Sequence, residues 1–348
     1  MLKIGIIGLG GISQKHITEI QKCEKGEICA ICDIKAETLK TVGDALGIPE
    51  NYRFTDYKDL IACDEVQAVE ICTPNYLHIP MAMDVVAAGK ALEVEKPLGV
   101  SCKGVDELLK SIDDAGVVNM TCFSYRFMPA VRYAKHLIEE GKLGKIVNVD
   151  VAYFKSSGFW LGRRLEWRFI KEYAGSGVIG DLGVHLIDMT RYLVGDFKTV
   201  YGTIETIVKQ RQKLDSDEYG DVETDDLASF IAKLENNITA NFLISRCAIG
   251  NENTIKFEIY GTDGVMRFNL NNPDELMVCI GEVDRETDSI HTVKVPQKYH
   301  IGQEETFINA ALGEIPEDFP FVSEGAACQK IVDAILESAE TGSVVKVM

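Results

Sequence analysis

The chain has 348 residues, of which 46% are hydrophobic and 26% are charged, the composition of a globular protein long enough for two domains with separate cores. Its formal net charge of −18 argues against nucleic acid and anionic membrane surfaces as partners, because the chain has too few cations to neutralise a row of phosphates. No stretch has the length of a membrane span, and the apolar opening lacks the features of a signal peptide, so we expect a cytoplasmic protein.

The first part of the chain alternates apolar, strand-like runs with segments of helical period. We expect strands at residues 2–7, 27–32, 67–72, 91–96 and 117–122, and helices at residues 11–23, 36–46, 77–88 and 101–115. The strands do not alternate polar with apolar residues, which suits a sheet covered on both faces. This order of elements predicts an α/β fold with a doubly wound parallel sheet.

A glycine-rich turn, Gly8-Leu9-Gly10-Gly11-Ile12-Ser13, lies between the first strand and the first helix. Its glycines allow a tight turn and let backbone N–H groups approach a pyrophosphate at the helix N-terminus, where the helix dipole favours anions. This is the dinucleotide fingerprint with serine in place of the third glycine. Asp33 closes the second strand 25 residues after Gly8, where an acid accepts hydrogen bonds from a ribose 2′-hydroxyl.

We therefore expect a bound dinucleotide, and NAD in preference to NADP, because the Asp33 carboxylate would face the 2′-phosphate of NADP. The residues expected to bind it here are Gly8, Gly10, Gly11, Ile12 and Asp33.

Ten cysteines are scattered through the chain. The one close pair, Cys29 and Cys32, lies in the second predicted strand, where residues three apart point to opposite faces. The two sulfurs are therefore badly placed to share a metal ion. We expect buried, reduced thiols and no metal.

The predicted strand at residues 91–96 ends in a lysine that a proline follows. Its carboxyl end lies where open α/β sheets place their ligands, so Lys96 is a candidate for chemistry. Pro97 restricts the backbone of Lys96 and tolerates a cis peptide bond, which would hold the lysine in one direction. The alternative is a surface turn with a solvated lysine.

The strand before it, at residues 67–72, leads into Thr73-Pro74-Asn75 and then His78. Together with Glu95-Lys96-Pro97, these residues resemble the Gfo/Idh/MocA oxidoreductases, and the resemblance covers nearly the whole chain. It implies an N-terminal Rossmann domain, a C-terminal α/β domain, a cis Lys96–Pro97 bond, and a lysine beside both nicotinamide and substrate. It also implies that Thr73, Pro74, Asn75 and Glu95 contact the cofactor. For His78, a cofactor contact and a structural position under the loop remain open.

The pattern changes after Phe123, where we place the domain boundary: residues 1–123 form the dinucleotide-binding domain and residues 124–348 a substrate-binding and oligomerisation domain. A helix at residues 130–140 is followed by strands at residues 145–154, 199–208, 227–234, 238–245, 254–260 and 265–270. We expect an α+β domain with an open, mostly antiparallel sheet. Since family members pair such sheets between subunits, the resemblance implies a homodimer or homotetramer.

Two positions follow the boundary closely. Ser124 stands where the family commonly has an asparagine near the cofactor, so that contact is in doubt. We expect Arg126 to contact the substrate.

A helical stretch at residues 180–192 carries Asp181 and His185, four residues apart and so on one face, with Asp188 one turn further on. Its apolar side carries Leu182, Leu186, Met189 and Leu193. A histidine flanked by carboxylates is usually structural, but this pair resembles the Asp-x-x-x-His motif of the same family, in which both side chains reach substrate hydroxyls. Imidazole suits proton transfer near neutral pH, so we expect Asp181 and His185 to be catalytic. Metal binding by this pair is the lesser possibility.

Two further expectations concern the second domain. Trp167-Arg168 stands at the spacing before Asp181 where the family often places a Trp-Arg pair against the cofactor, although arginine and tryptophan also stack for structural reasons. His300, next to Tyr299, is a candidate for the lining of the substrate pocket.

The function we expect is reversible hydride transfer between nicotinamide and a hydroxyl-bearing carbon of a sugar, glycoside or inositol-like cyclitol. His185 would take the hydroxyl proton, Asp181 would orient His185 or grip a neighbouring hydroxyl, and Lys96 would stabilise the developing oxyanion. Two alternatives remain open. One is a glycoside hydrolase that acts by transient oxidation with tightly held NAD, and the other is a ligand-sensing regulator without activity.

Overall fold

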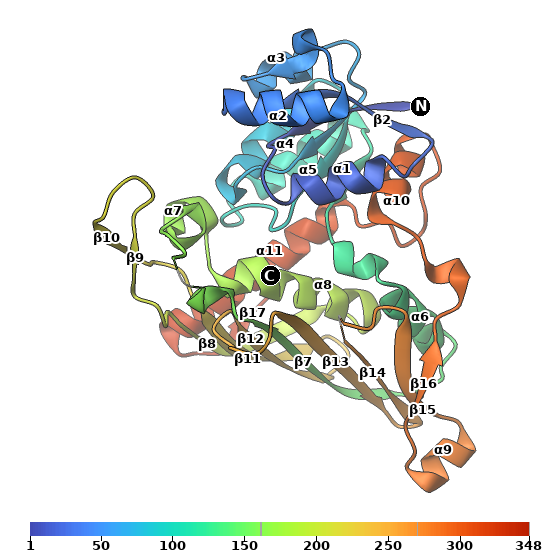
Figure 1. Ribbon diagram of the computed structural model, residues 1–348. Helices are drawn as coiled ribbons and strands as arrows, with labels where there is room; N and C mark the ends of the chain where they lie inside the picture. The colour runs from blue at the N-terminus through green and yellow to red at the C-terminus, as the bar shows by residue number, and fades with distance from the viewer. Residues whose placement is uncertain (161, 270, 348) are drawn as a thin grey trace. The chain divides into compact units, whose positions relative to one another are not determined.

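Residues 1–160, 162–269 and 271–347 are described by the computed structural model, and the chain divides into two units (Figure 1). The first unit contains Met1–Phe123 and Gly302–Ala327, and the second contains Ser124–Ile301 and the chain from Cys328 onward. The break after Phe123 is the one that the change in sequence pattern predicts. The segment Gly302–Ala327 is a correction, because we predicted that it belongs to the second domain.

The described strands of the first unit form one parallel sheet of six strands in the order β3-β2-β1-β4-β5-β6. They are β1 (Leu2–Ile7), β2 (Gly26–Cys32), β3 (Arg53–Phe54), β4 (Ala68–Ile71), β5 (Ala91–Val94) and β6 (Asn119–Thr121). The strand order reverses between β1 and β4. This is the predicted Rossmann arrangement, and the reversal is the point at which such sheets bind their ligands.

Helices cover both faces of this sheet. One face packs against α1 (Ser13–Ile20), α2 (Ala36–Leu46) and α10 (Gln303–Ala311), and the other against α3 (Tyr57–Ala62), α4 (His78–Ala87) and α5 (Val105–Ala115). Along β1, Ile6 points into the core under α1, α2 and α10, and Ile7 points into the core under α3, α4 and α5. Because both faces are buried, the strands are apolar throughout, which is why their sequences show no alternation.

Some predicted boundaries are wrong by a few residues. The strand predicted at residues 91–96 ends at Val94, because the backbone N–H of Lys96 donates to the side chain of Glu95 instead of continuing the ladder. The helix predicted at residues 101–115 begins at Val105, after Gly104 with φ of +83°. The short β3 and α3 were not predicted.

The described part of the second unit contains a sheet of nine strands in the order β16-β15-β14-β13-β7-β12-β11-β8-β17. Its strands are β7 (Ile146–Lys155), β8 (Phe197–Glu205), β11 (Leu227–Leu234), β12 (Thr239–Ser245), β13 (Asn253–Gly261), β14 (Gly264–Asn269), β15 (Glu275–Ile280), β16 (His291–Lys294) and β17 (Val345–Lys346). Only the pairing of β7 with β12 is parallel among these described strands, so the sheet is mostly antiparallel, as predicted. Leu270, the last residue of one predicted strand, lies outside the described residues.

Helices α6 (Pro129–Glu139) and α8 (Val184–Leu193) lie over one face of this sheet (Figure 1). The remaining elements of the unit are α7 (Lys171–Ala174), α9 (Glu282–Thr287), the second part of α11 (Val322–Thr341), and a separate ribbon of β9 (Gln210–Gln212) and β10 (Tyr219–Asp221). Short 3₁₀ turns in the chain span Glu50–Tyr52, Asn75–Leu77, Ser124–Phe127, Ser157–Phe159, Trp167–Phe169 and Gln297–Tyr299. None of the described helices is both long enough and apolar enough to cross a membrane.

The opposite face of the nine-stranded sheet carries exposed apolar side chains. Along β7, Val149, Val151 and Tyr153 are buried, whereas the alternating positions between them are only partly covered. On that partly covered side, Ile231 is 50% exposed and Leu243 is 41% exposed. One side of β7 is therefore apolar and buried, and the other is mixed and partly exposed.

Substitutions in and after α10 can test whether this helix belongs to the core of the first unit. Phe307 on α10 is fully buried in the core with α1, whereas Leu312 directly after the helix is 48% exposed. We predict that Phe307→Ala lowers the free energy of unfolding of the first unit by about 3–5 kcal/mol, because it removes apolar contacts and leaves a cavity. Leu312→Ala should change it by less than about 0.5 kcal/mol. Denaturant unfolding measures both, and equal effects would mean that α10 is not part of this core.

Candidate active site

Four loops of the first unit meet at one edge of the parallel sheet. Gly8 follows β1, Asp33 follows β2, Thr73 follows β4, and Lys96 lies two residues beyond β5. Parallel strands that lie side by side end at the same edge, so these loops converge. The predicted cofactor residues of this unit are therefore brought together.

The small residues of the glycine-rich turn have different surroundings. Gly8 has φ of +89°, and a Cβ there would lie 2.8 Å from the carbonyl oxygen of Cys72 on the neighbouring strand, so only glycine fits. Around Gly10 and Gly11 a Cβ would meet open space, which leaves the start of α1 accessible to a ligand. Ser13, in place of the third glycine, donates from Oγ to the carbonyl oxygen of Gly10 at 2.7 Å and ties the turn to the helix.

The carboxylate of Asp33 is already oriented within this turn. Its Oδ2 accepts from the backbone N–H of Leu9 at 2.9 Å, and its Oδ1 accepts from the backbone N–H of Lys35 at 2.9 Å. Each carboxylate oxygen accepts more than one hydrogen bond, so both retain capacity for ribose hydroxyls. An open helix N-terminus beside a fixed acid fits a dinucleotide, which Gly10, Gly11, Ile12 and Asp33 would hold.

His78 has a structural position. Its imidazole is 1% exposed, and its Nδ1 and Nε2 each lie 2.8 Å from a backbone carbonyl oxygen, those of Pro97 and Thr73 respectively. The ring thus lies between the Thr73-Pro74-Asn75 loop and the segment after Lys96, and its single N–H donates to one of the two carbonyl oxygens. Of the two possibilities left open by the sequence, the geometry favours the position under the loop over a cofactor contact.

Lys96 is half-buried at this edge, and the Lys96–Pro97 bond is cis, as predicted. The backbone N–H of Lys96 donates to Glu95 Oε2 at 3.0 Å, and His16 Nε2 lies 3.0 Å from Glu95 Oε1. Burial opposes the charged form of Glu95, but the hydrogen bond with His16 and the charges of His16 and Lys96 hold the pKa of Glu95 below its usual value. Both carboxylate oxygens of Glu95 thus have a partner inside the protein, and Glu95 positions the backbone of Lys96. Its contact with a cofactor stays a prediction.

In the second unit, the helix predicted at residues 180–192 consists of two parts. Asp181 lies in a π-helical turn, Ile179–Gly183, which continues directly into α8 with His185 in its first turn. Turns of this kind are frequent at functional sites. The predicted apolar side of the helix is buried, and His185 itself is only 7% exposed.

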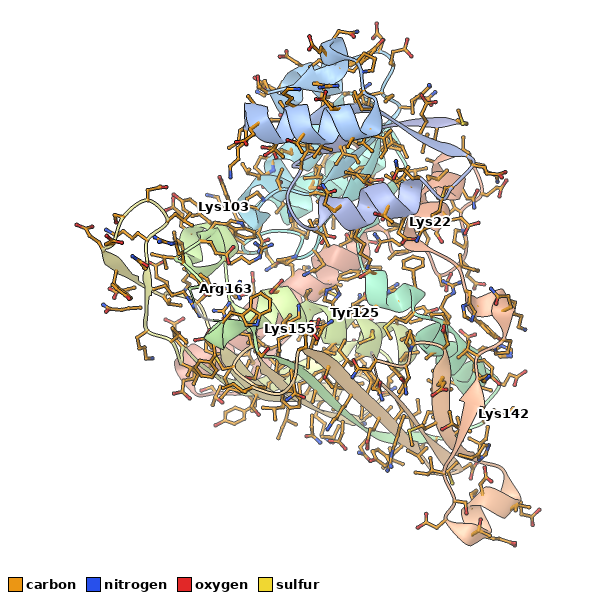
Figure 2. The ribbon with its side chains drawn as sticks, viewed as in Figure 1. Lys22, Lys103, Tyr125, Lys142, Lys155 and Arg163 are labelled. Atoms are coloured by element: carbon orange, nitrogen blue, oxygen red, sulfur yellow. The ribbon has the colours of Figure 1, made fainter. Side chains whose placement is uncertain are left out.

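A tyrosine pair that the sequence analysis missed lies beside His185. The ring centroids of Tyr125 and His185 are 4.3 Å apart, and the hydroxyl oxygens of Tyr125 and Tyr153 are 2.6 Å apart. Tyr153 donates its only proton to Asn253 Oδ1 at 2.9 Å, so Tyr125 donates to Tyr153. Lys155, labelled with Tyr125 in Figure 2, lies with Nζ 5.7 Å from the centroid of the Tyr153 ring and adds a positive charge to this group.

The environment keeps Tyr153 protonated. Burial, followed by the influence of Tyr125 and the charge of Asp181, raises the pKa of Tyr153 above its usual value. Tyr153 therefore remains a neutral hydrogen-bond donor at physiological pH. The signal in the sequence was a tyrosine at the end of the apolar side of a strand, which we did not single out.

Arg126, predicted to contact the substrate, has partners inside the protein. It is 4% exposed, its Nε lies 2.9 Å from both carboxylate oxygens of Asp188, and its guanidinium packs over the ring of Tyr192 at 5.0 Å. A buried guanidinium held by a carboxylate on α8 fixes that helix. The contact of Arg126 with the substrate stays a prediction. Sequence spacing did not show that Asp188, 62 residues later, is a partner of Arg126.

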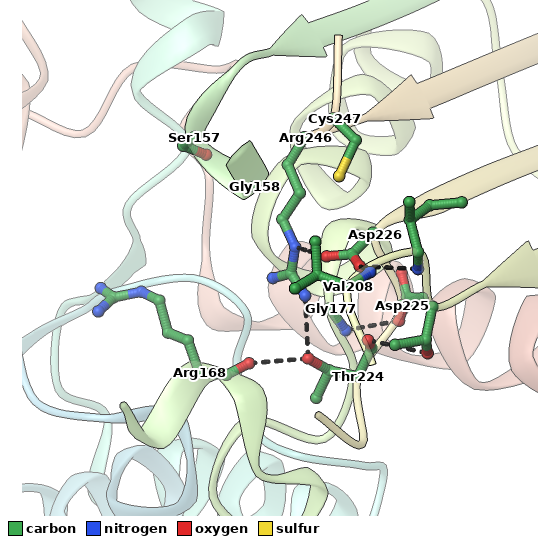
Figure 3. A network of polar contacts seen from close by, with 12 residues as sticks. Ser157, Gly158, Arg168, Gly177, Val208, Thr224, Asp225, Asp226, Arg246 and Cys247 are labelled. Carbon is green, nitrogen blue, oxygen red and sulfur yellow. Dashed lines mark hydrogen bonds and ion pairs between the residues drawn. The ribbon is translucent and has the colours of Figure 1, made fainter. Parts of the chain in front are cut away.

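Trp167 and Arg168 stack on each other in a 3₁₀ turn, with the guanidinium carbon of Arg168 4.3 Å from the centroid of the indole ring. Both side chains are partly exposed, and their contact with a cofactor stays a prediction. The backbone of this turn is fixed by Thr224, whose Oγ1 donates to the carbonyl oxygen of Arg168 at 3.0 Å. Figure 3 shows that the side chain of Arg168 points away from this network.

The same network positions the turn that carries Asp181 (Figure 3). Asp225 accepts from the backbone N–H groups of Gly177 at 2.6 Å and Ile179 at 3.0 Å, at the start of the π-helical turn. The next residue, Asp226, forms a buried ion pair with Arg246, and Arg246 also donates to Thr224 Oγ1 at 3.1 Å. These buried groups are paired with one another, which makes the backbone around Asp181 rigid.

His300 lies away from this group in the second unit. Its Nδ1 is 3.7 Å from Asp274 Oδ1, and its neighbour Tyr299 packs on Tyr133 and His136 of α6. Within the described residues, no contact links His300 to His185 or Tyr125. The predicted role of His300 in the substrate pocket is therefore not supported.

The sequence of this chain is similar to two family models and to several known proteins. Residues 2–123 match a family model described as "Oxidoreductase family, NAD-binding Rossmann fold", and residues 131–267 match one described as "GFO/IDH/MocA C-terminal domain". The chain is 32% identical to levoglucosan dehydrogenase of Pseudarthrobacter phenanthrenivorans over 84% of this chain and 83% of that protein. It is 25% identical to glucose-6-phosphate 3-dehydrogenase of Bacillus subtilis over 97% of this chain and 96% of that protein.

A solved structure of levoglucosan dehydrogenase in complex with NADH and L-sorbose matches with a TM-score of 0.92 and 29% identity, and covers 100% of this chain and 99% of that one. The chain therefore belongs to the Gfo/Idh/MocA family of oxidoreductases, as its motifs indicated. Its first domain is an NAD-binding Rossmann fold.

The pair of Arg126 and Asp188 can be tested by a mutant cycle. We predict that Arg126→Met lowers the free energy of unfolding by about 3–5 kcal/mol, because it leaves the Asp188 charge buried without its partner. The double variant with Asp188→Leu should recover most of that loss. Lys213→Met, which removes an exposed ion pair with Glu218, should cost less than about 1 kcal/mol. A variant Arg126→Met with parental stability and a raised KM would support the role in substrate binding.

Proposed function

We propose that this protein is an NAD-dependent dehydrogenase that acts on a hydroxyl-bearing carbon of a sugar, anhydrosugar or inositol-like cyclitol. The observation that supports this best is the convergence of the glycine-rich turn, Asp33 and Lys96 at one edge of the parallel sheet. The similar proteins named as dehydrogenases of levoglucosan, glucose 6-phosphate and myo-inositol support the class of substrate.

In this proposal Lys96, Asp181 and His185 are the catalytic side chains. When bound, the nicotinamide supplies the hydride acceptor. His185 takes the proton of the substrate hydroxyl, and a positive charge on Lys96 stabilises the oxygen on which negative charge develops. Asp181 orients His185, and the ring of Tyr125 at 4.3 Å restricts the plane of the imidazole. Trp167 and Arg168 supply a stacked surface for the cofactor.

The deciding experiment is a panel of sugars, anhydrosugars and cyclitols, with levoglucosan, glucose 6-phosphate and myo-inositol among them, scored by the absorbance of NADH. Substrate-dependent reduction of added NAD supports a dehydrogenase. Cleavage of a glycoside with no net reduction of added NAD would indicate a hydrolase that acts by transient oxidation. Sugar binding without either reaction would indicate a regulator.

The proposed role of Lys96 can be tested by substitution. Lys96→Ala should keep binding of NAD and lower kcat by a hundredfold or more, because the loss of one preorganised charge costs about 3–4 kcal/mol of transition-state stabilisation. Lys103→Ala is the matched control, since Lys103 is an exposed lysine in the same connection to α5, labelled in Figure 2. Its kcat should stay at the parental value. Turnover of Lys96→Ala at the parental rate would remove Lys96 from the mechanism.

The choice of cofactor depends on Asp33. Two like charges about 4 Å apart near a protein surface repel by about 4 kcal/mol, so the carboxylate disfavours the 2′-phosphate of NADP. We expect kcat/KM to be higher with NAD than with NADP, and Asp33→Ser to narrow the difference at some loss of affinity for NAD. Lys35, two residues on, is exposed and available to a phosphate, which would soften the preference. A clear preference of the parent enzyme for NADP would overturn this reading of Asp33.

We further propose that two copies of the chain pair through the open face of the nine-stranded sheet, as a homodimer or within a homotetramer. The half-exposed Ile231 and Leu243 lie on adjacent strands of this face, and pairing would remove them from water. Light scattering at micromolar concentration should give at least the mass of a dimer. Ile231→Lys should lower that mass, whereas Val283→Lys on α9, where the valine is 72% exposed, should not. A monomeric mass of the parent protein would contradict the proposal.

A further inference from the structure

A group of buried titratable side chains lies inside the first unit, and the proposed reaction does not use it. It contains His16 of α1, Glu70 of β4, Glu93 of β5 and Glu304 of α10, which are between 0% and 3% exposed. Glu70 and Glu93 are direct neighbours in the register of β4 and β5. Each interrupts an otherwise apolar strand and points to the side of the sheet that α1 and α10 cover, where a bare carboxylate is strongly unfavourable.

The distances within this group suit a metal ion. His16 Nδ1 lies 3.2 Å from Glu70 Oε2 and 3.1 Å from Glu304 Oε1. One nitrogen or oxygen of each of the four residues lies within 4.8 Å of those of the other three. Ligands bound at about 2.1 Å to one ion are about 3.0–3.4 Å from their neighbours in octahedral or tetrahedral geometry. The two distances from His16 Nδ1 fall in that range.

Apart from the ion-pair contacts of His16 Nδ1 with Glu70 and Glu304, several inward atoms of the group have no hydrogen-bond partner. Across the described residues, none forms a hydrogen bond with His16 Nδ1, with either carboxylate oxygen of Glu70, with Glu93 Oε2 or with Glu304 Oε2. Buried polar atoms are nearly always paired, and a protonated carboxyl group would donate to a neighbouring acceptor, which Glu70 does not do. Burial, with the charge of Glu304 as a smaller cause, raises the pKa of Glu70 to about 8. Burial opposes a charged His16, yet the charges of Cys72 and Glu304 raise the pKa of His16 well above its usual value, so a metal ion would displace protons that the group otherwise holds.

The outer contacts of the group are those of a metal site. His16 Nε2 lies 3.0 Å from Glu95 Oε1, and when it donates to that oxygen a metal ion can replace the second ring proton at Nδ1, which faces Glu70 and Glu304. A histidine that binds a metal through one nitrogen usually donates from the other to a carboxylate in this way. Gln303 Nε2 donates to Glu93 Oε1 and Glu304 Oε1, both at 3.0 Å, and so orients two of the carboxylates.

We propose that His16, Glu70, Glu93 and Glu304 bind one divalent transition metal ion inside the first unit. One imidazole nitrogen with carboxylate oxygens suits Mn²⁺, Fe²⁺ or Zn²⁺, whereas Mg²⁺ and Ca²⁺ favour oxygen ligands alone. This departs from our expectation of no metal, which considered only the cysteines and the pair of Asp181 and His185. The ion joins α1, β4, β5 and α10, and through His16 and Glu95 it reaches the backbone of Lys96. Its role is structural and does not depend on the proposed function.

Elemental analysis of the full-length protein is the direct test. Protein expressed with manganese, iron and zinc in the medium should contain about one equivalent of one of these metals after gel filtration in EDTA. Protein expressed in chelator-treated medium should contain little, and addition of MnCl₂, FeCl₂ or ZnCl₂ should raise its melting temperature by about 5 °C or more. Neither measurement depends on turnover.

Matched variants locate the ion. Glu70→Gln and Glu304→Gln each remove one ligand and should lower the metal content at least tenfold. Glu305→Gln makes the same change of charge at the next position of α10, where the side chain is exposed, and should keep the full equivalent. If a glutamine variant does not fold, the comparison of the two parent preparations still decides. Metal below about a tenth of an equivalent with no shift in melting temperature, or metal that Glu70→Gln retains, would overturn the proposal and leave a cluster that holds protons.

Discussion

Parallel pairing of β1, β2, β4 and β5 is the constraint on which the first unit depends. It brings the carboxyl ends of these strands to one edge, so the turn at Gly8, the acid Asp33 and the lysine Lys96 converge although they are far apart in the sequence. The same arrangement buries the strands on both faces. A charged residue in a central strand then has no access to water and must find a partner inside the protein.

This constraint connects the edge of the sheet to its interior. Glu95 accepts from the backbone N–H of Lys96 with one oxygen and from His16 with the other, and His16 faces the carboxyl groups on β4, β5 and α10. The segment Gly302–Ala327 is therefore an integral part of the first unit, because it supplies Glu304 and Gln303 to this group. The position of the proposed catalytic lysine and the packing of the core are linked by hydrogen bonds.

The second unit follows the same physical rule with different residues. A buried carboxylate pairs with a buried guanidinium at Asp188 and Arg126, and Asp225 accepts from the backbone of the turn that carries Asp181. Groups taken out of water are stable only when they are paired, and pairing holds each of them in one direction. The imidazole of His185 packs on Tyr125, and its helix is held by these pairs, which suits the proposed transfer of a proton.

The sequence by itself determined the Rossmann order, the boundary after Phe123, the positions of Gly8 and Asp33, and the apolar side of α8, because periodicity, glycine spacing and strand ends are local properties of the chain. It also indicated the family. Only the tertiary structure decided that Arg126 pairs with Asp188, that His78 joins two loops, that Gly302–Ala327 returns to the first unit, and that Glu70 and Glu93 face His16 and Glu304. The glutamates inside apolar strands were visible in the sequence, but their partners were not. Contacts between residues tens to hundreds of positions apart depend on how helices and strands pack, and no local pattern encodes that packing.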